Sequence, residues 1–482
     1  GQEAENVAEA MQDQSHVKFP DTPTTQDLGS KVIGRSWLTQ AVIELTRITA
    51  PVTASFSFIN LCYIFTIYFM SHNLPRAEFA GVAMGLTLSN VTATGIGLGM
   101  ACALDTLCSQ QYGRDKESTN MGILLQRAFL VTFLLFVPLT ILYFLFADSV
   151  LRLIFPHTVA IYCAVWLKWS IIITLPVVLY ECTQKFVQCQ CEANIILFSS
   201  VLGSLSAPVL LYAFKDHGIH GFAISLSLNR WLTLLILFYN ISRKPNLMRT
   251  WGGWRTESLE FWPLLSYMRM GLPSVAAFCA DLWGFEAMAV MAGHCGEREA
   301  AAWVILMNIF GVLWGPAAGI CSSAAVKVGN ALGANNPKRA TQMAIASSLL
   351  AFAAGTLCAL FLAFAGKWVF TSLSGDKTVT SLGLEILPNA SIAIFLDVMF
   401  YVGQGIYRGC GKQFVVSGMV CGSLWGVGLP ASAYLAFTLH KGIHGILLGF
   451  IVGVGVCIPT MVIGATSFNW EDLATKASNE HS

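Results

Sequence analysis

Four carboxylic acids lie in apolar segments of the second half of the chain, where an ionisable side chain is costly. Asp281 and Glu286 fall within one apolar run, Glu299 opens the next, and Asp397 lies in a third. Ionisable groups inside a membrane span are rare because they lose their hydration, and those that occur usually serve transport or coupling. We therefore take these four acids as candidate groups for binding a cation or a proton.

Aromatic side chains accompany the first pair of acids. Successive helical residues are rotated by about 100°, so Asp281 and Glu286 point about 140° apart and serve different faces of a helix. Phe285 follows Asp281 by four residues, and Trp283 precedes Glu286 by three. A carboxylate beside an aromatic face suits an organic cation. Because burial favours a neutral carboxyl group, such a site can hold either a proton or a cation, which is the basis of antiport.

The same acids can instead form structural ion pairs. Lys168 and Arg230 lie in apolar runs and are available as partners, and their roles, like that of Glu181, are otherwise unexplained. We expect Glu181 and Glu385 to be paired or interfacial. Asp105 lies at the end of an apolar run, where we expect it to cap a helix or anchor a loop.

The composition indicates that membrane spans hold these residues. The chain has 482 residues, of which 55% are hydrophobic and 11% are charged, against about 25% charged in soluble domains. Mean hydropathy is +0.63. The 28 basic and 27 acidic residues leave no surplus of positive charge for nucleic acid. No zinc, nucleotide-binding or hydrolase motif occurs, so we predict no metal, no cofactor and no enzymatic activity.

We predict an all-α integral membrane protein with twelve transmembrane helices. Residues 1–47 are expected to be a flexible cytoplasmic tail, 48–241 an N-lobe, 242–262 a cytoplasmic linker, 263–467 a C-lobe and 468–482 a C-terminal tail. Loop lysines and arginines gather on the side of the termini, which places both termini in the cytoplasm. The predicted spans, each long enough to cross the bilayer, are approximately 48–71, 80–107, 121–147, 159–187, 195–214, 219–241, 264–293, 300–325, 340–365, 379–402, 414–438 and 443–467.

The two halves of the chain contain a repeat. Arg47, Pro51 and Phe56 recur, with similar neighbours, at an offset of 222 residues. Three further anchors have offsets of 220 to 224 residues: Gly113 with Gly333, Gln184 with Gln404, and the Gly-Ile-His-Gly tetrapeptide at 218–221 with that at 442–445. The repeat predicts two pseudo-symmetric six-helix lobes of the same orientation, related by an axis along the membrane normal. This architecture is typical of secondary transporters.

Three motifs resemble the multidrug and toxin extrusion (MATE) transporters of the eukaryotic branch. They are Asn90–Gly113, Val326–Ala334 and Gln404–Gly411, and the resemblance extends over about residues 40–468. It implies a V-shaped pair of lobes that exports organic cations, xenobiotics or amphipathic metabolites in exchange for protons, or for sodium in some bacterial members. We expect a monomer in the bilayer of the plasma membrane or of a vacuole or lysosome.

The resemblance also assigns roles to residues. Position by position, it places proton coupling and substrate binding on the four acids, two of which are Asp where animal members usually have Glu. The first span has no acid, as in the eukaryotic branch, so coupling is expected through the C-lobe. In the expected cycle, protonation of Asp281 or Glu286 bends or straightens the seventh helix at the hinge Pro273 and releases the cation. The expected supporting substrate contacts are Trp283, Phe285, Gln184, Gln404 and Asn308.

Three other functions remain open at this point. The first is export of organic anions or plant-type metabolites such as citrate, flavonoids or alkaloids. The second is flipping of a lipid-linked oligosaccharide by a protein of the same superfamily, which predicts a basic rather than an acidic cavity. The third is a membrane-embedded enzyme, for which no nucleophile and base occur at a suggestive spacing.

Overall fold

The structure is a computed structural model, and it describes residues 37–374 and 376–479. Within these residues every regular element is a helix. The N-lobe consists of α3 (Trp37–Asn73), α4 (Arg76–Ser89), the π-helical turn η2 (Asn90–Thr94), α5 (Gly95–Ala101), α6 (Ala103–Arg114), α7 (Asn120–Ile154), α8 (His157–Cys189), α9 (Ala193–Phe214), the short η3 (Lys215–His217) and α10 (Gly218–Ser242).

The C-lobe repeats this plan. A linker with α11 (Pro245–Trp251) and η4 (Thr256–Leu259) leads to the second lobe. That lobe consists of α12 (Phe261–Cys295), α13 (Glu297–Gly333), α14 (Pro337–Leu373), α15 (Lys377–Gly409), the interrupted helix α16 (Gln413–Val420), η5 (Cys421–Gly428), α17 (Leu429–Ala433) and η6 (Tyr434–Thr438), and α18 (Gly442–Thr466).

The described chain crosses the membrane twelve times. Eleven helical segments are long and apolar enough to span a bilayer, and the longest of them is Ala193–Ser242. That segment consists of the two helices α9 and α10, which reverse direction at η3 and pack against each other. Gly218 adopts a positive φ of 57° at this reversal, a conformation that glycine reaches without steric cost. The predicted all-α fold with twelve transmembrane helices is confirmed.

The predicted N-terminal tail needs correction at its boundary, whereas the predicted C-terminal segment contains a helix of its own. Helix α3 begins at Trp37, so residues 37–47 belong to the first span, and residues 1–36 lie outside the described part of the chain. The C-terminal segment contains α19 (Trp470–Asn479), which packs on α6, α13 and α14. Its apolar residues Leu473, Ala474 and Ala477 are buried. This amphipathic spacing supplies the packing energy that a free tail would lack.

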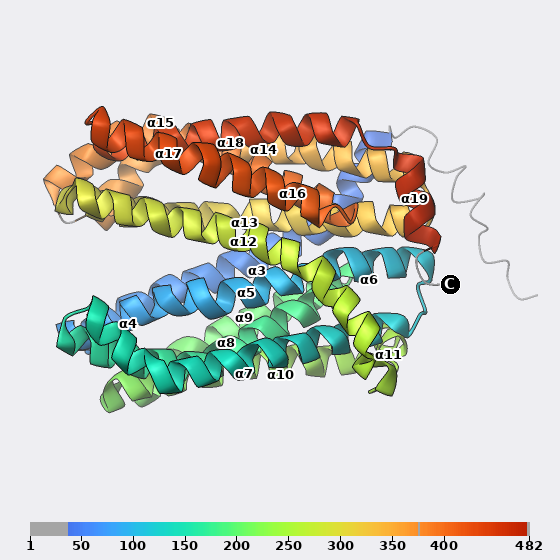
Figure 1. Ribbon diagram of the computed structural model, residues 1–482, viewed down its shortest axis with the longest axis horizontal. Helices are drawn as coiled ribbons and strands as arrows, with labels where there is room; N and C mark the ends of the chain where they lie inside the picture. Colours follow the sequence, from blue (N-terminus) through green and yellow to red (C-terminus); the bar gives the residue numbers. More distant parts are fainter. Residues whose placement is uncertain (1–36, 375, 480–482) are drawn as a thin grey trace, which may run out of the picture.

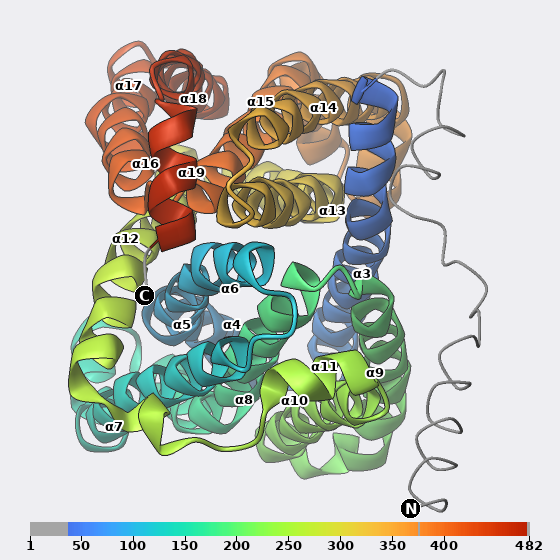
Figure 2. The same cartoon turned by 90° about the vertical axis from the view of Figure 1, so that its right-hand side faces the viewer.

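The two lobes form two layers, which lie closest together where α6 meets α13 and are farther apart at the opposite end (Figure 1). We call the closed end, which carries the linker and α19, the linker end (Figure 2). The first helix of each lobe also packs on the other lobe. Ala41 and Leu45 of α3 join the core of α13 and α14, and Tyr267 of α12 donates a hydrogen bond of 3.1 Å to the Met100 carbonyl of α5.

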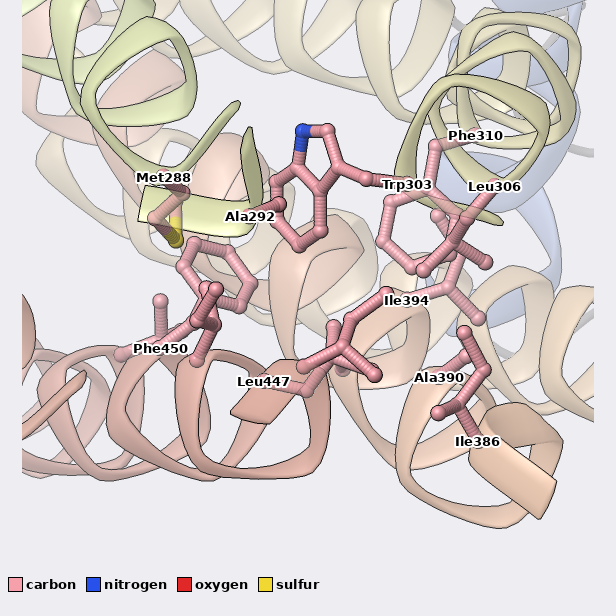
Figure 3. Close-up of a cluster of buried hydrophobic side chains, with 14 of the residues drawn as sticks. Met288, Ala292, Trp303, Leu306, Phe310, Ile386, Ala390, Ile394, Leu447 and Phe450 are labelled. Atoms are coloured by element: carbon pink, nitrogen blue, oxygen red, sulfur yellow. The ribbon is translucent and has the colours of Figure 1, made fainter. Parts of the chain in front are cut away.

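Each lobe has its own apolar core, and the outer surface of the bundle is apolar as well. In the C-lobe core, side chains of α12, α13, α15 and α18 face one another, including Trp303, Phe310 and Phe450 (Figure 3). On the outside, Leu153 and Phe364 are more than 80% exposed. Large apolar side chains directed outward are the pattern expected of helices that face lipid.

Candidate transport site

A partly open cavity of about 280 Å³ lies mainly within the C-lobe and contains two of the predicted acids. Asp281 of α12 and Asp397 of α15 both line it, and Asn60 of α3 contributes to the lining from the first span. The remaining lining is mainly aromatic and apolar, and consists of Phe278, Leu282, Phe285, Met307, Phe310, Gly311, Trp314 and Tyr401. The site therefore combines two carboxyl groups with several aromatic faces.

The helix that carries Asp281 is fixed from two sides. Phe285, one turn after Asp281 and on the same face, packs against Phe450 of α18 with ring centroids 5.3 Å apart. The Trp425 indole of η5 donates a hydrogen bond of 2.9 Å to the Ala280 carbonyl. These contacts hold Asp281 toward α13 and α15.

Both cavity acids are poorly compensated by protein groups. Asp397 is only 4% exposed, and the Asp281 Oδ1 atom is buried without a hydrogen-bond partner among residues 37–374 and 376–479. Within the described residues, no basic group lies within 4.0 Å of either carboxylate. An unpaired carboxylate in such surroundings is expensive. Each acid therefore needs a proton or a bound cation to be neutralised.

The other two predicted acids lie outside this cavity. Glu286 does not line the cavity, in agreement with the helical rotation that places it on a different face of α12 from Asp281. Glu299 is in the first turn of α13, far along the helix from the cavity, and lies 3.8 Å from Arg298. The alternative that Lys168 or Arg230 forms a structural ion pair with one of the four acids finds no support, because Lys168 pairs with Asp148 and no ion pair of Arg230 occurs in the described chain.

Only one of the expected supporting contacts lines the cavity, and that is Phe285. Trp283 instead joins the lobes by donating a hydrogen bond of 3.0 Å to the Val91 carbonyl. Asn308 lines a separate cavity between α3, α13 and α14, and its amide donates to the Val304 carbonyl at 2.8 Å. Gln184 and Gln404 are buried within α8 and α15.

The proposed hinge residue lies in a closely packed part of α12. The helix continues through Pro273 from Phe261 to Cys295. Two residues earlier, a Cβ atom on Gly271 would collide with the Met100 sulfur of α5. A proline removes one backbone hydrogen bond and bends a helix, so movement at Pro273 would shift α12 against the N-lobe.

Sequence reasoning missed a buried ionic cluster that joins the two lobes. Lys185 of α8 lies 3.0 Å from Asp105 of α6 and 3.6 Å from Glu181, which confirms the expectation that Glu181 is paired. Arg408 of α15 reaches Asp105 from the other lobe at 3.4 Å. The Asp105, Lys185 and Arg408 side chains are 1%, 6% and 8% exposed. Asp105 is therefore part of an inter-lobe bridge and not, as expected, a helix cap or a loop anchor.

One face of α15 connects the acid cavity with this ionic cluster. Asp397, Tyr401, Gln404 and Arg408 follow one another at spacings of four, three and four residues, which places them on one side of a helix. Tyr401 lines the cavity, and the Arg408 guanidinium lies 5.7 Å from the centre of the Tyr401 ring. The Gln404 amide nitrogen is buried and has no hydrogen-bond partner in the part of the chain that the structure describes. These four residues therefore extend along α15 from the acid cavity to the ionic cluster that joins the lobes.

The linker end is closed by reciprocal contacts between the repeats. The Gln110 amide donates to the Gly409 carbonyl at 3.1 Å. Its repeat counterpart Asn330 donates to the Cys189 carbonyl at 3.2 Å. Both partners of the second bond are related to those of the first by an offset of 220 residues.

Two glycines, which are also related by the repeat, allow the helices to approach this closely. A Cβ atom on Gly113 of α6 would collide with the Asn330 carbonyl of α13, and one on Gly333 would collide with the Gln110 carbonyl.

A single methyl group at this contact is expected to destabilise the closed linker end. We predict that Gly333→Ala lowers the free energy of unfolding by about 1–3 kcal/mol, because overpacking displaces α6 from α13. Gly455→Ala in α18 is the matched control, since nothing lies within 4 Å of its Cβ position and helical alanine is favoured over glycine. Thermal unfolding in detergent measures both variants, and equal melting temperatures would contradict the prediction.

The fold and the site define a class of protein: a twelve-pass, two-lobe membrane protein with a carboxylate-bearing internal cavity, as in secondary transporters. A sequence model of the MatE family matches residues 51–213 and 273–434. The chain therefore belongs to the MatE family, and it is a multi-pass membrane transporter. The predicted family is confirmed.

Individual relatives agree with this assignment. The chain is 28% identical to Protein DETOXIFICATION 16 of Arabidopsis thaliana over 464 residues, which cover 94% of each chain. It is 28% identical to Multidrug and toxin extrusion protein 2 of Mus musculus over 90% of this chain and 75% of that protein. The crystal structure of the eukaryotic MATE transporter AtDTX14 has the same fold, with a TM-score of 0.85 and 21% identity over 92% of this chain and 99% of that one.

Proposed function

We propose that this protein exports organic cations in exchange for protons and that Asp281 and Asp397 bind both ligands in turn. The observation that carries the proposal is that two buried carboxyl groups share one aromatic-lined cavity and have no basic partner among the described residues. An organic cation would gain charge pairing from the acids and cation–π attraction from the rings. The names of the relatives, which refer to detoxification and to multidrug and toxin extrusion, agree with export of small molecules.

Exchange of a proton for an organic cation follows because both compete for the same carboxylate charge. Protonation of Asp281 or Asp397 removes the negative charge that holds the cation, so proton binding weakens cation binding, and the reverse holds by linkage. We favour protons over sodium because a proton needs a single carboxyl oxygen, whereas hard metal cations take several oxygen ligands. Most of this cavity wall is carbon.

The cavity also bears on the alternative functions. A flippase for a lipid-linked oligosaccharide would need a basic cavity for the phosphate groups, and this one is acidic. Within the C-lobe, an organic anion would meet two unpaired carboxylates and be repelled. The C-lobe cavity therefore favours a cationic substrate over both alternatives.

Proton-coupled exchange is tested with purified protein in liposomes whose lumen is acidic. We expect uptake of radiolabelled tetraethylammonium that depends on the pH gradient, that stops when an ionophore collapses the gradient, and that is unaffected by replacing sodium with choline. Uptake that follows a sodium gradient instead would overturn proton coupling. Absence of uptake for a panel of organic cations, with the protein folded and inserted, would overturn the cationic substrate class.

A further inference from the structure

A second internal cavity, of about 200 Å³, lies within the N-lobe between α3, α4, α8 and α10. It differs from the C-lobe cavity in charge, because it is lined by a base, Arg230, and by no Asp or Glu among the described residues. Arg230 is the central residue of α10, twelve residues from Gly218 and twelve from Ser242. At 1.5 Å per residue this is about 18 Å from either end of the helix, which is the middle of the span.

Arg230 differs from the other bases that the sequence places within spans. Lys168 has Asp148 as a partner, Arg127 donates to the Glu257 carbonyl at 3.0 Å, and Arg269 is on the exposed surface of α12. In the part of the chain that the structure describes, no carboxylate lies within 4.0 Å of Arg230 and its guanidinium donates no hydrogen bond. An uncompensated charge at this depth is retained at a high energetic cost, which calls for a ligand of opposite charge.

Polar groups around Arg230 are also free to bind a ligand. Asn90 and Thr94 come from the π-helical turn η2, and Thr174 comes from α8. None of these three side chains makes a hydrogen bond to another described residue. By contrast, the Asn229 amide nitrogen of the same cavity is already held by the Gly203 carbonyl at 2.7 Å. Single π-helical turns often occur at functional sites, and this one brings two unused polar side chains to the cavity.

We propose that the N-lobe cavity is a binding site for an organic carboxylate, with Arg230 as the residue that recognises its charge. The planar guanidinium matches a carboxylate through two parallel hydrogen bonds, and the free groups of Asn90, Thr94 and Thr174 can satisfy its remaining lone pairs. Tyr63, Ile67 and Leu226 supply an apolar wall for the organic part of the ligand. This site goes beyond the proposed cation–proton exchange and does not depend on it.

Binding of radiolabelled benzoate to the full chain in phosphatidylcholine nanodiscs tests the site. We expect saturable binding that falls at least tenfold in affinity in Arg230→Gln and is partly retained in Arg230→Lys. Arg269→Gln is the matched control, because it removes the same charge from an exposed position of α12, and it is expected to bind benzoate normally. Retained thermal stability establishes that Arg230→Gln is folded.

Several results would overturn the proposal. These are absence of benzoate binding to the wild type, equal affinity in Arg230→Gln, and displacement of benzoate by chloride at equal concentration, which would make the ligand an inorganic anion. Asp281→Asn separates the two sites, since it is expected to leave benzoate binding intact even where cation exchange is lost. Loss of cation exchange and loss of benzoate binding are therefore measured separately, so a negative result for the exchange does not contradict the carboxylate site.

Discussion

Replacing Asp281 by asparagine is expected to abolish cation uptake driven by a pH gradient, with a loss of at least about tenfold at saturating substrate. Asparagine has nearly the shape of a protonated aspartic acid, so the variant is locked in the state that releases the cation. The buried Oδ1 atom of Asp281 has no hydrogen-bond partner within the described residues, so no protein contact is lost and the fold is expected to persist. Tetraethylammonium uptake into acid-loaded liposomes measures the effect.

The matched control for this prediction is Asp216→Asn. Asp216 lies in the exposed turn η3 between α9 and α10, so the same chemical change there should leave uptake unaltered. Glu286→Gln is expected to reduce uptake less than Asp281→Asn does, because Glu286 lies outside the cavity. Uptake by Asp281→Asn at the wild-type rate would reduce this carboxyl group to a structural role.

Replacing Asp105 by asparagine is expected to cost about 3–5 kcal/mol of stability, because the buried Arg408 then has no acidic partner among the described residues and Lys185 keeps only Glu181. Lys185 and Arg408 both contact this carboxylate, and Arg408 does so from the other lobe. The two lobes should therefore also separate more easily at the linker end. Thermal unfolding reports the loss of stability, and labelling of a cysteine introduced at Gln110 in a chain without other reactive cysteines reports the separation.

Asp148→Asn provides the comparison for the Asp105 variant. Asp148 also pairs with a lysine, but the Asp148 and Lys168 side chains are 42% and 30% exposed, and exposed pairs contribute about 1 kcal/mol or less. If Asp105→Asn and Asp148→Asn changed the melting temperature equally, the cluster would not hold the lobes together. If labelling at position 110 were unchanged in Asp105→Asn, the cluster would contribute to stability without keeping the linker end closed.

Much of the fold could be predicted from the sequence because the bilayer imposes a simple rule on span length and polarity. The rule places the spans well, but it does not define where a helix stops outside the hydrocarbon. Helix α3 therefore begins at Trp37, before the apolar run, and α19 forms beyond the last span. Both extensions depend on packing against other helices, which the hydropathy pattern does not record.

The candidate site was predictable in part for a related reason. An acidic residue within an apolar run is easily recognised in the sequence. The rotation per helical residue also indicated that Asp281 and Glu286 lie on different faces of α12, and only Asp281 lines the cavity. The inter-lobe cluster could not be found in this way, because Asp105, Lys185 and Arg408 lie near span ends, where charges are ordinary. A signal was nevertheless present: Asp105 and Arg408 both fall within the motifs Asn90–Gly113 and Gln404–Gly411 that carry the family resemblance.

The reciprocal contact at the linker end has the form of a homodimer interface contained in one chain. In a two-fold homodimer, residue i of one subunit contacts residue j of the other, and j contacts i. Gln110 with Gly333 and Gly113 with Asn330 obey this relation across the two halves of a single polypeptide. A six-helix protein inserted in one orientation could have paired with a second copy of itself through this same surface, so gene duplication and fusion would have preserved an existing interface rather than required a new one.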